Sequence, residues 1–198
     1  MTALLRLSRW IDAFTERVGR FVAWLIMAAV LISALNAVVR KAFNYSSNAF
    51  LEIQWYLFSA VFLLAAGYTL LRQEHVKIDV VIGRFSRRTQ VTIEAVCIVL
   101  FLFPFCFAVI DLVWPLVVRA YVMGEMSQNA GGLIRWPVFA LLPLGFVLLL
   151  VQAVSELIKR IAFLRGIIED PTVKAKTKTD EEALAEFLRE QQEAGAKP

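Results

Sequence analysis

Four long runs of apolar residues constrain the fold of this chain more than any other feature. The runs cover about residues 21–39, 53–71, 95–118 and 136–154. A helix that crosses a bilayer needs roughly 20 predominantly apolar residues. A single soluble core in a chain of 198 residues could not bury four such runs. The sequence therefore predicts an all-α integral membrane protein with four transmembrane helices, which form a membrane domain over residues 21–165.

The overall composition agrees with this class. Hydrophobic residues make up 59% of the chain and charged residues 19%, whereas an average soluble domain is about 25% charged. The net charge of +4 does not indicate a nucleic-acid partner, because the basic residues lie between the apolar runs and form no separate basic domain. The expected surroundings of most of the chain are membrane lipid.

Basic residues are concentrated in three segments that lie on one side of the membrane if four helices cross it. They are Arg6, Arg9, Arg17 and Arg20 before the first run, Arg72, Lys77, Arg84, Arg87 and Arg88 after the second, and Lys159, Arg160 and Arg165 after the fourth. The other two connections carry only Arg40, Lys41, Arg119 and Arg135. Since Lys and Arg accumulate in cytoplasmic loops, we expect a multi-pass protein of the bacterial inner membrane with both termini in the cytoplasm.

Two polar segments flank the expected membrane domain. Residues 1–20 are expected to form an amphipathic helix at the membrane interface, because arginines lie opposite an apolar face. That apolar face consists of Leu7, Ile11, Phe14 and Val18. The alternative is that this helix covers a helix of another subunit. Residues 166–198 are expected to be a charged cytoplasmic tail, in which residues 180–194 are rich in strong helix formers and predict a short helix.

The sequence offers few residues for catalysis or cofactor binding. The only histidine, His75, falls in a loop on the cytoplasmic side, whereas a haem-binding membrane anchor needs histidine within its spans. No cluster of metal ligands and no nucleotide-binding motif is found in the sequence. We therefore expect neither an enzyme nor a resident cofactor.

Glu94 and Asp111 are the ionisable residues closest to the lipid. Seventeen residues at about 1.5 Å each separate them by about 25 Å, nearly the full hydrocarbon thickness. Each carboxylate is therefore expected near one membrane interface. Contact with a partner subunit and a role in ion coupling remain as alternatives.

Two segments, taken together, resemble a known family. The first contains Glu52-Ile-Gln-Trp-Tyr, then Ala65-Ala66-Gly67-Tyr68-Thr69-Leu70 and Glu74-His75-Val76-Lys77-Ile78-Asp79. The second contains Gly124-Glu125-Met126-Ser127, Gly131-Gly132-Leu133, Trp136-Pro137 and Leu142-Pro143-Leu144-Gly145-Phe146, with Gln152 further on. Over about residues 20–160 the chain is similar to the small membrane subunit (DctQ-like) of the tripartite ATP-independent periplasmic (TRAP) transporters.

The resemblance implies a secondary-active transporter with three kinds of subunit. A periplasmic solute-binding protein captures an organic acid. A large multi-span permease subunit carries the substrate and coupling-ion sites and moves as an elevator, usually with sodium. The small subunit packs on the static scaffold of the large one and holds no transport site. Its family-type positions, with roles in folding or subunit contact, are Glu52, His75, Asp79, Glu125, Ser127, Trp136, Pro143 and Gly145.

Two local features have more than one interpretation. Glu52 is a family-type position, but it also lies at the expected N-terminus of the second span, where the helix dipole stabilises a carboxylate. This dipole effect alone is sufficient to explain an acidic residue there. The segment 124–135 either helps to dock the periplasmic binding protein or is an ordinary connecting loop, in which Gly131 and Gly132 supply turn conformations.

Three other functions remain open from the sequence. The chain could be the small subunit of another tripartite carboxylate transporter, which also has four spans. It could be the membrane anchor of a redox enzyme, which predicts bound haem or quinone. It could be a free-standing carrier or channel, which requires a polar lining that the four apolar runs do not supply.

Overall fold

The computed structural model describes residues 2–44, 47–73 and 84–169, and these residues are almost entirely helical. The helices are α1 (Thr2–Phe43), α2 (Asn48–Arg72), α4 (Arg87–Cys97), α5 (Phe103–Val122) and α6 (Trp136–Leu164), with a π-helical turn, η1 (Ile98–Leu102), between α4 and α5. The predicted all-α class is confirmed. His75, Asp79 and the expected helix in the C-terminal tail lie outside the described residues.

Four helical segments are long and apolar enough to cross a membrane, as the sequence predicts. They are α1, α2, α6 and the continuous stretch from α4 through η1 to α5. Each helix is longer than the apolar run within it. The 42 residues of α1 extend over about 63 Å, roughly twice the hydrocarbon thickness of a bilayer.

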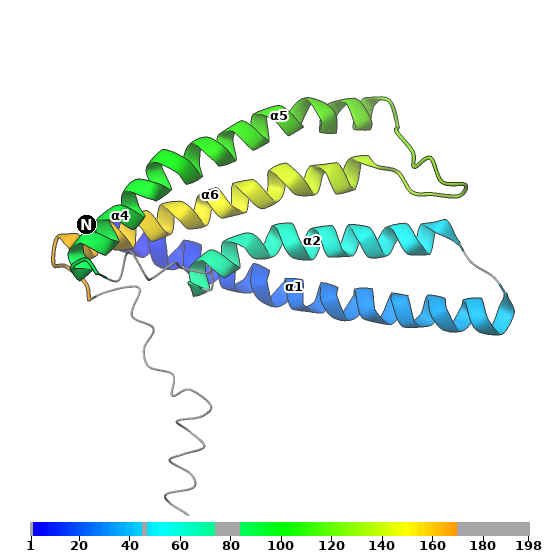
Figure 1. Ribbon diagram of the computed structural model, residues 1–198, viewed down its shortest axis with the longest axis horizontal. Helices are drawn as coiled ribbons and strands as arrows, with labels where there is room; N and C mark the ends of the chain where they lie inside the picture. Colours follow the sequence, from blue (N-terminus) through cyan, green and yellow to red (C-terminus); the bar gives the residue numbers. More distant parts are fainter. Residues whose placement is uncertain (1, 45–46, 74–83, 170–198) are drawn as a thin grey trace, which may run out of the picture.

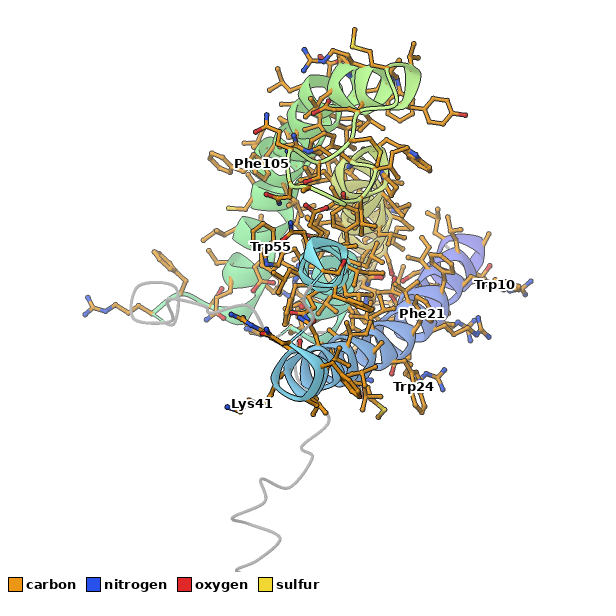
Figure 2. The ribbon with its side chains drawn as sticks, turned by 90° about the vertical axis from the view of Figure 1, so that its right-hand side faces the viewer. Trp10, Phe21, Trp24, Lys41, Trp55 and Phe105 are labelled. Carbon is orange, nitrogen blue, oxygen red and sulfur yellow. The ribbon has the colours of Figure 1, made fainter. Side chains whose placement is uncertain are left out.

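The helices lie side by side in the order α1, α2, α6, α5 (Figure 1). Successive helices in this order contact each other, and α1 also contacts α6. In the view along the helices, the side chains of Trp10, Phe21 and Trp24 project from one side of the array, and those of Trp55 and Phe105 project from the other (Figure 2). The described helices therefore form one layer with two broad faces and with α5 at one edge.

Alanine is the most frequent buried apolar residue within this layer. In each spanning helix no more than 28% of the most apolar 18-residue window is buried. The buried apolar positions include Ala29, Ala60, Ala153 and Ala162. Large apolar side chains such as Phe62 and Leu112, which are 79% and 77% exposed, point outward. This is the arrangement expected where lipid or another membrane protein is the surrounding medium, because small residues allow membrane helices to approach closely.

A proline, Pro104, lies just after the π-helical turn η1. Pro104 has no N–H to donate to the carbonyl four residues before it. Immediately before it, Phe103 N–H bonds to Ile98 O, five residues back, as a π-helical turn requires. At this π-helical turn the segment passes from α4 into α5, which is curved (Figure 1).

The N-terminal segment continues into the first span without a break. Residues 2–20 belong to the same helix as residues 21–43, so no change of backbone marks the expected boundary at residue 20. Ser8 and Thr15 are buried against α6, whereas Leu7 and Phe14 are 49% and 47% exposed. The face that packs within the layer is thus polar, and the expected apolar face is free for lipid. The interfacial position of this helix remains a prediction.

Candidate functional site

Glu52 holds the loop between α5 and α6, which we call the outer loop (residues 123–135). Its carboxylate accepts hydrogen bonds from the Ser127 hydroxyl, from Asn129 Nδ2 at 2.8 Å and from the Leu133 backbone N–H at 2.6 Å. Only 6% of Glu52 is exposed, although it lies near the beginning of α2. Glu52 therefore connects two segments about 80 residues apart, a role that the helix-dipole interpretation did not include.

The outer loop folds back on itself above this carboxylate. Ser127 N–H donates to Leu133 O at 2.9 Å, and Met126 and Ile134 form an isolated antiparallel bridge. A Cβ atom on Gly132 would lie 2.5 Å from Ser127 Cβ and 2.8 Å from Glu52 Oε1. Gly131 has a φ of +71°, which L side chains rarely adopt. Gly131 permits the turn, and Gly132 leaves the room that Glu52 needs.

Two further side chains of α2 hold the same loop. Asn48 Nδ2 donates to Ala130 O at 3.0 Å, and Tyr56 Oη donates to Ile134 O at 2.9 Å. Sequence reasoning did not identify either residue. Their polar ends lie one turn on either side of Glu52 along α2, and this spacing was the available signal.

The base of the outer loop contains two more of the predicted positions. Glu125 Oε1 pairs with Arg135 Nη1 at 3.0 Å, and Arg135 N–H donates to Glu125 O at 2.9 Å. The Trp136 ring meets the Tyr121 ring edge to face, with centroids 5.5 Å apart. These contacts join the end of α5 to the beginning of α6. Four predicted positions, Glu52, Glu125, Ser127 and Trp136, therefore lie at one end of the layer.

The outer loop and α2 enclose an open recess of about 460 Å³. Its lining includes Glu52, Tyr56, Ser127, Asn129 and Arg135. Both oxygens of Glu52 already accept hydrogen bonds, and Arg135 already pairs with Glu125. This arrangement positions a loop, and the carboxylate is not free to act as a base. Within the described ranges, no three His, Cys, Asp or Glu side chains are grouped as metal ligands.

Pro143 and Gly145 lie in the middle of the layer, on α6, and both are buried. A Cβ atom on Gly145 would lie 2.8 Å from both Cβ and the backbone oxygen of Leu63 on α2. Gly67 on α2 approaches α6 in the same way, because its Cβ would lie 3.2 Å from Leu148 O. The absence of these two side chains sets the distance between α2 and α6. The role of Gly145 is thus close helix packing.

A second polar cluster lies at the opposite end of the layer. This α1–α6 cluster consists of Ser8, Asp12, Thr15, Gln152, Ser155, Glu156, Lys159 and Arg160. Asp12 accepts from Gln152 Nε2 at 3.0 Å and from Ser155 Oγ at 2.6 Å, and it pairs with Lys159 Nζ at 3.1 Å. Gln152, which belongs to the second segment of the family resemblance, thus bonds to two residues of α1.

Charged groups extend this cluster to α2 and α4. Glu156 pairs with Lys159 and with Arg160 Nη1, the latter at 2.5 Å, and it accepts from Gln73 Nε2 at 2.8 Å. Arg160 Nη2 also pairs with Glu94 Oε2 at 3.0 Å. Glu156 and Arg160 have side chains only 1% and 4% exposed, so the pair depends on these partners. Glu94 therefore forms an ion pair with a residue of this same chain.

Comparison with known families gives one clear result. The model of the family "Tripartite ATP-independent periplasmic transporters, DctQ component" matches residues 29–163. A comparison with curated proteins finds no match. The matched range includes α2, the outer loop and all five α6 residues of the α1–α6 cluster. The chain therefore belongs to the DctQ family, the small membrane component of the TRAP transporters.

Proposed function

We propose that this chain is the small permease subunit that packs on the scaffold of the large elevator-type subunit and stabilises it. The complex takes up an organic acid, delivered by a periplasmic binding protein, in symport with an ion. The substrate and coupling-ion sites belong to the large subunit, and this chain acts without a cofactor or catalytic group. Family membership supports the proposal, because the family is a component of a tripartite transporter.

The single-layer arrangement is the observation that carries this proposal. A compact four-helix bundle encloses a core between its helices. Here the helices lie in one row, both broad faces are covered with exposed apolar side chains, and little of each span is buried (Figure 2). A layer of this kind adds width to a neighbouring membrane protein. An elevator-type subunit needs such width in the part that stays fixed while its transport domain moves.

Asp111 indicates which edge of the layer meets the large subunit. It is exposed on α5, at the edge of the layer, and it forms no ion pair or hydrogen bond with any described residue. Eleven residues, or about 16 Å along the helix, separate it from the end of α5 at Val122, so that it lies within the span but toward its outer end. A carboxylate at this depth requires a polar partner. We infer that the large subunit supplies a cation or hydrogen-bond donor here.

The outer loop supports a second contact of the same proposal. From the positive-inside rule we expect both termini in the cytoplasm and the outer loop in the periplasm. Glu52, Asn48 and Tyr56 fix the loop backbone before any partner arrives. A fixed loop loses little conformational entropy on binding. The outer loop is therefore a suitable docking surface for the periplasmic binding protein.

Co-purification tests the proposal directly. The tagged chain is expressed together with the large TRAP permease subunit and purified in mild detergent. We expect the large subunit to elute with it in a fixed ratio, and uptake in reconstituted liposomes to require both chains and the binding protein. Transport by this chain alone, or haem or quinone bound to it, would contradict the scaffold role and support one of the alternative functions.

A further inference from the structure

Three arginines on α1 form an open groove beside a tryptophan. Arg6, Arg9, Trp10, Ala13 and Arg17 line this groove, which has a volume of about 380 Å³. All three arginines are exposed, and 76% of Trp10 is exposed. Trp10 projects away from the other helices, on the same side of α1 as Phe21 and Trp24 (Figure 2). We call this surface the α1 arginine groove.

The guanidinium groups of the groove have no acidic partner among the described residues. In contrast, Arg72 pairs with Glu16 at 2.5 Å, Arg135 with Glu125, and Arg160 with Glu156. Repulsion between three neighbouring cations is unfavourable unless an anion lies between them. The groove is therefore a candidate anion site.

The opposite side of the same helical segment is fixed to α6. Ser8 bonds to Ser155 at 2.7 Å, Thr15 donates to Gln152 at 2.8 Å, and Asp12 pairs with Lys159. These bonds determine how α1 is rotated about its axis. The arginine groove must then face outward, with its three arginines on the same side of α1 before a ligand binds.

The surface next to the groove becomes apolar along the same face of the helix. Phe21, Trp24 and Leu31 follow Arg17 at positions 4, 7 and 14 residues further on, and they are 58%, 66% and 62% exposed. This spacing keeps them on the side of the helix that Arg17 occupies. The distance from Arg17 to Leu31 is about 21 Å, somewhat more than one leaflet of the hydrocarbon region. The surface thus combines a cationic head with an apolar strip long enough for an acyl chain.

We propose that the α1 arginine groove binds the headgroup of an anionic phospholipid. Arg6, Arg9 and Arg17 hold the phosphate, since guanidinium groups match its oxygens in pairs. Trp10 lies at the headgroup level, and the acyl chains lie along Phe21, Trp24 and Leu31. A lipid with two phosphates binds more tightly than one with a single phosphate, because three cations face it. This site depends on the membrane position of α1 and not on the scaffold role.

Lipid retention by the purified full-length chain tests this site. The delipidated protein is incubated with phosphatidylcholine, phosphatidylglycerol or cardiolipin, and native mass spectrometry measures the bound fraction of each. We expect cardiolipin to bind most tightly and phosphatidylcholine least. Each Arg→Gln change at positions 6, 9 and 17 is expected to weaken cardiolipin binding about fivefold, and the triple change about a hundredfold.

A matched control uses the other end of the same helix. Arg40 and Lys41 are also exposed and basic, but the nearest tryptophans in the sequence, Trp24 and Trp55, are at least 14 residues away. We expect Arg40→Gln with Lys41→Gln to leave cardiolipin binding within twofold of the unmodified chain. Equal binding by the triple variant and the unmodified chain would overturn the proposal. Displacement of the lipid by millimolar inorganic phosphate would also overturn it, because the site would then recognise soluble phosphate. If the triple variant loses helix content, the cardiolipin binding of the single Arg9→Gln variant tests the proposal in its place.

Discussion

Replacing Asp111 by leucine should have opposite effects on the free subunit and on the complex. In the free subunit, Asp111 is exposed about 16 Å inside the end of α5, without a partner among the described residues. An aspartate costs about 3 kcal/mol at the centre of a membrane helix and less toward its ends, whereas leucine is slightly favourable. Asp111→Leu should therefore stabilise the free subunit in the bilayer by up to about 3 kcal/mol.

The same change should weaken assembly with the large subunit. Association relieves the cost of an unpaired carboxylate, and this contribution of up to about 3 kcal/mol disappears with the side chain. A further loss of about 0.6–1.7 kcal/mol comes from the hydrogen bond or ion pair between the helices. Together these losses correspond to a decrease in the association constant of roughly tenfold to a thousandfold.

The assay measures both effects in parallel. Thermal unfolding of the free subunit in nanodiscs reports its stability, and the ratio of large to small subunit after purification in mild detergent reports assembly. Leu112→Ala is the matched control, because Leu112 is adjacent and 77% exposed but carries no charge. If Asp111→Leu stabilises the free subunit and leaves the subunit ratio unchanged, the carboxylate faces lipid in the complex and the inferred contact at α5 is wrong.

Three other changes test the remaining parts of the structure. Glu52→Ala should speed amide hydrogen exchange at Leu133 and Gly132 by at least tenfold. Glu52→Gln should retain most of the protection, because the oxygen of its amide can still accept a hydrogen bond from Leu133 N–H. Equal exchange in both variants would contradict the loop-holding role. Gly145→Ala should lower stability by about 1–2 kcal/mol, since overpacking exceeds the gain in helix propensity, and Gly67→Ala should cost less in the same unfolding assay. Glu156→Leu should destabilise the subunit by about 3–5 kcal/mol, because Arg160 is left buried with fewer partners; a melting temperature equal to that of the unmodified chain would refute this.

The sequence was sufficient to predict the spans, because a bilayer imposes a length and composition on every helix that crosses it. The four apolar runs at about 21–39, 53–71, 95–118 and 136–154 all fall within spanning helices. The family was also accessible, because the motifs around Glu52 and Gly145 depend on local identity. These features do not require knowledge of which helix lies next to which.

The neighbours of each helix were not predictable in this way. Lipid tails and leucine side chains are equally apolar, so hydrophobic periodicity does not distinguish a lipid-facing side from a side that contacts another helix. On α1 the apolar residues predicted a side that faces lipid, but they did not predict that Ser8, Asp12 and Thr15 contact α6. The partners of Glu52 were equally inaccessible, because Ser127 and Leu133 lie 75 and 81 residues away.

The positions of the two polar clusters explain how a single layer of helices keeps its order. Between membrane helices there is little hydrophobic driving force, so specific polar contacts and close packing determine which helices adjoin. Here the outer loop ties α2 to α5 and α6 at one end, and the α1–α6 cluster ties α1, α2, α4 and α6 at the other. Between them, Gly67 and Gly145 bring α2 and α6 together. A layer fixed at both ends resists shear between its helices. This is the mechanical property that the proposed static support for a moving transport domain requires, and it leaves both broad faces free for lipid and the α5 edge free for the proposed contact with the large subunit.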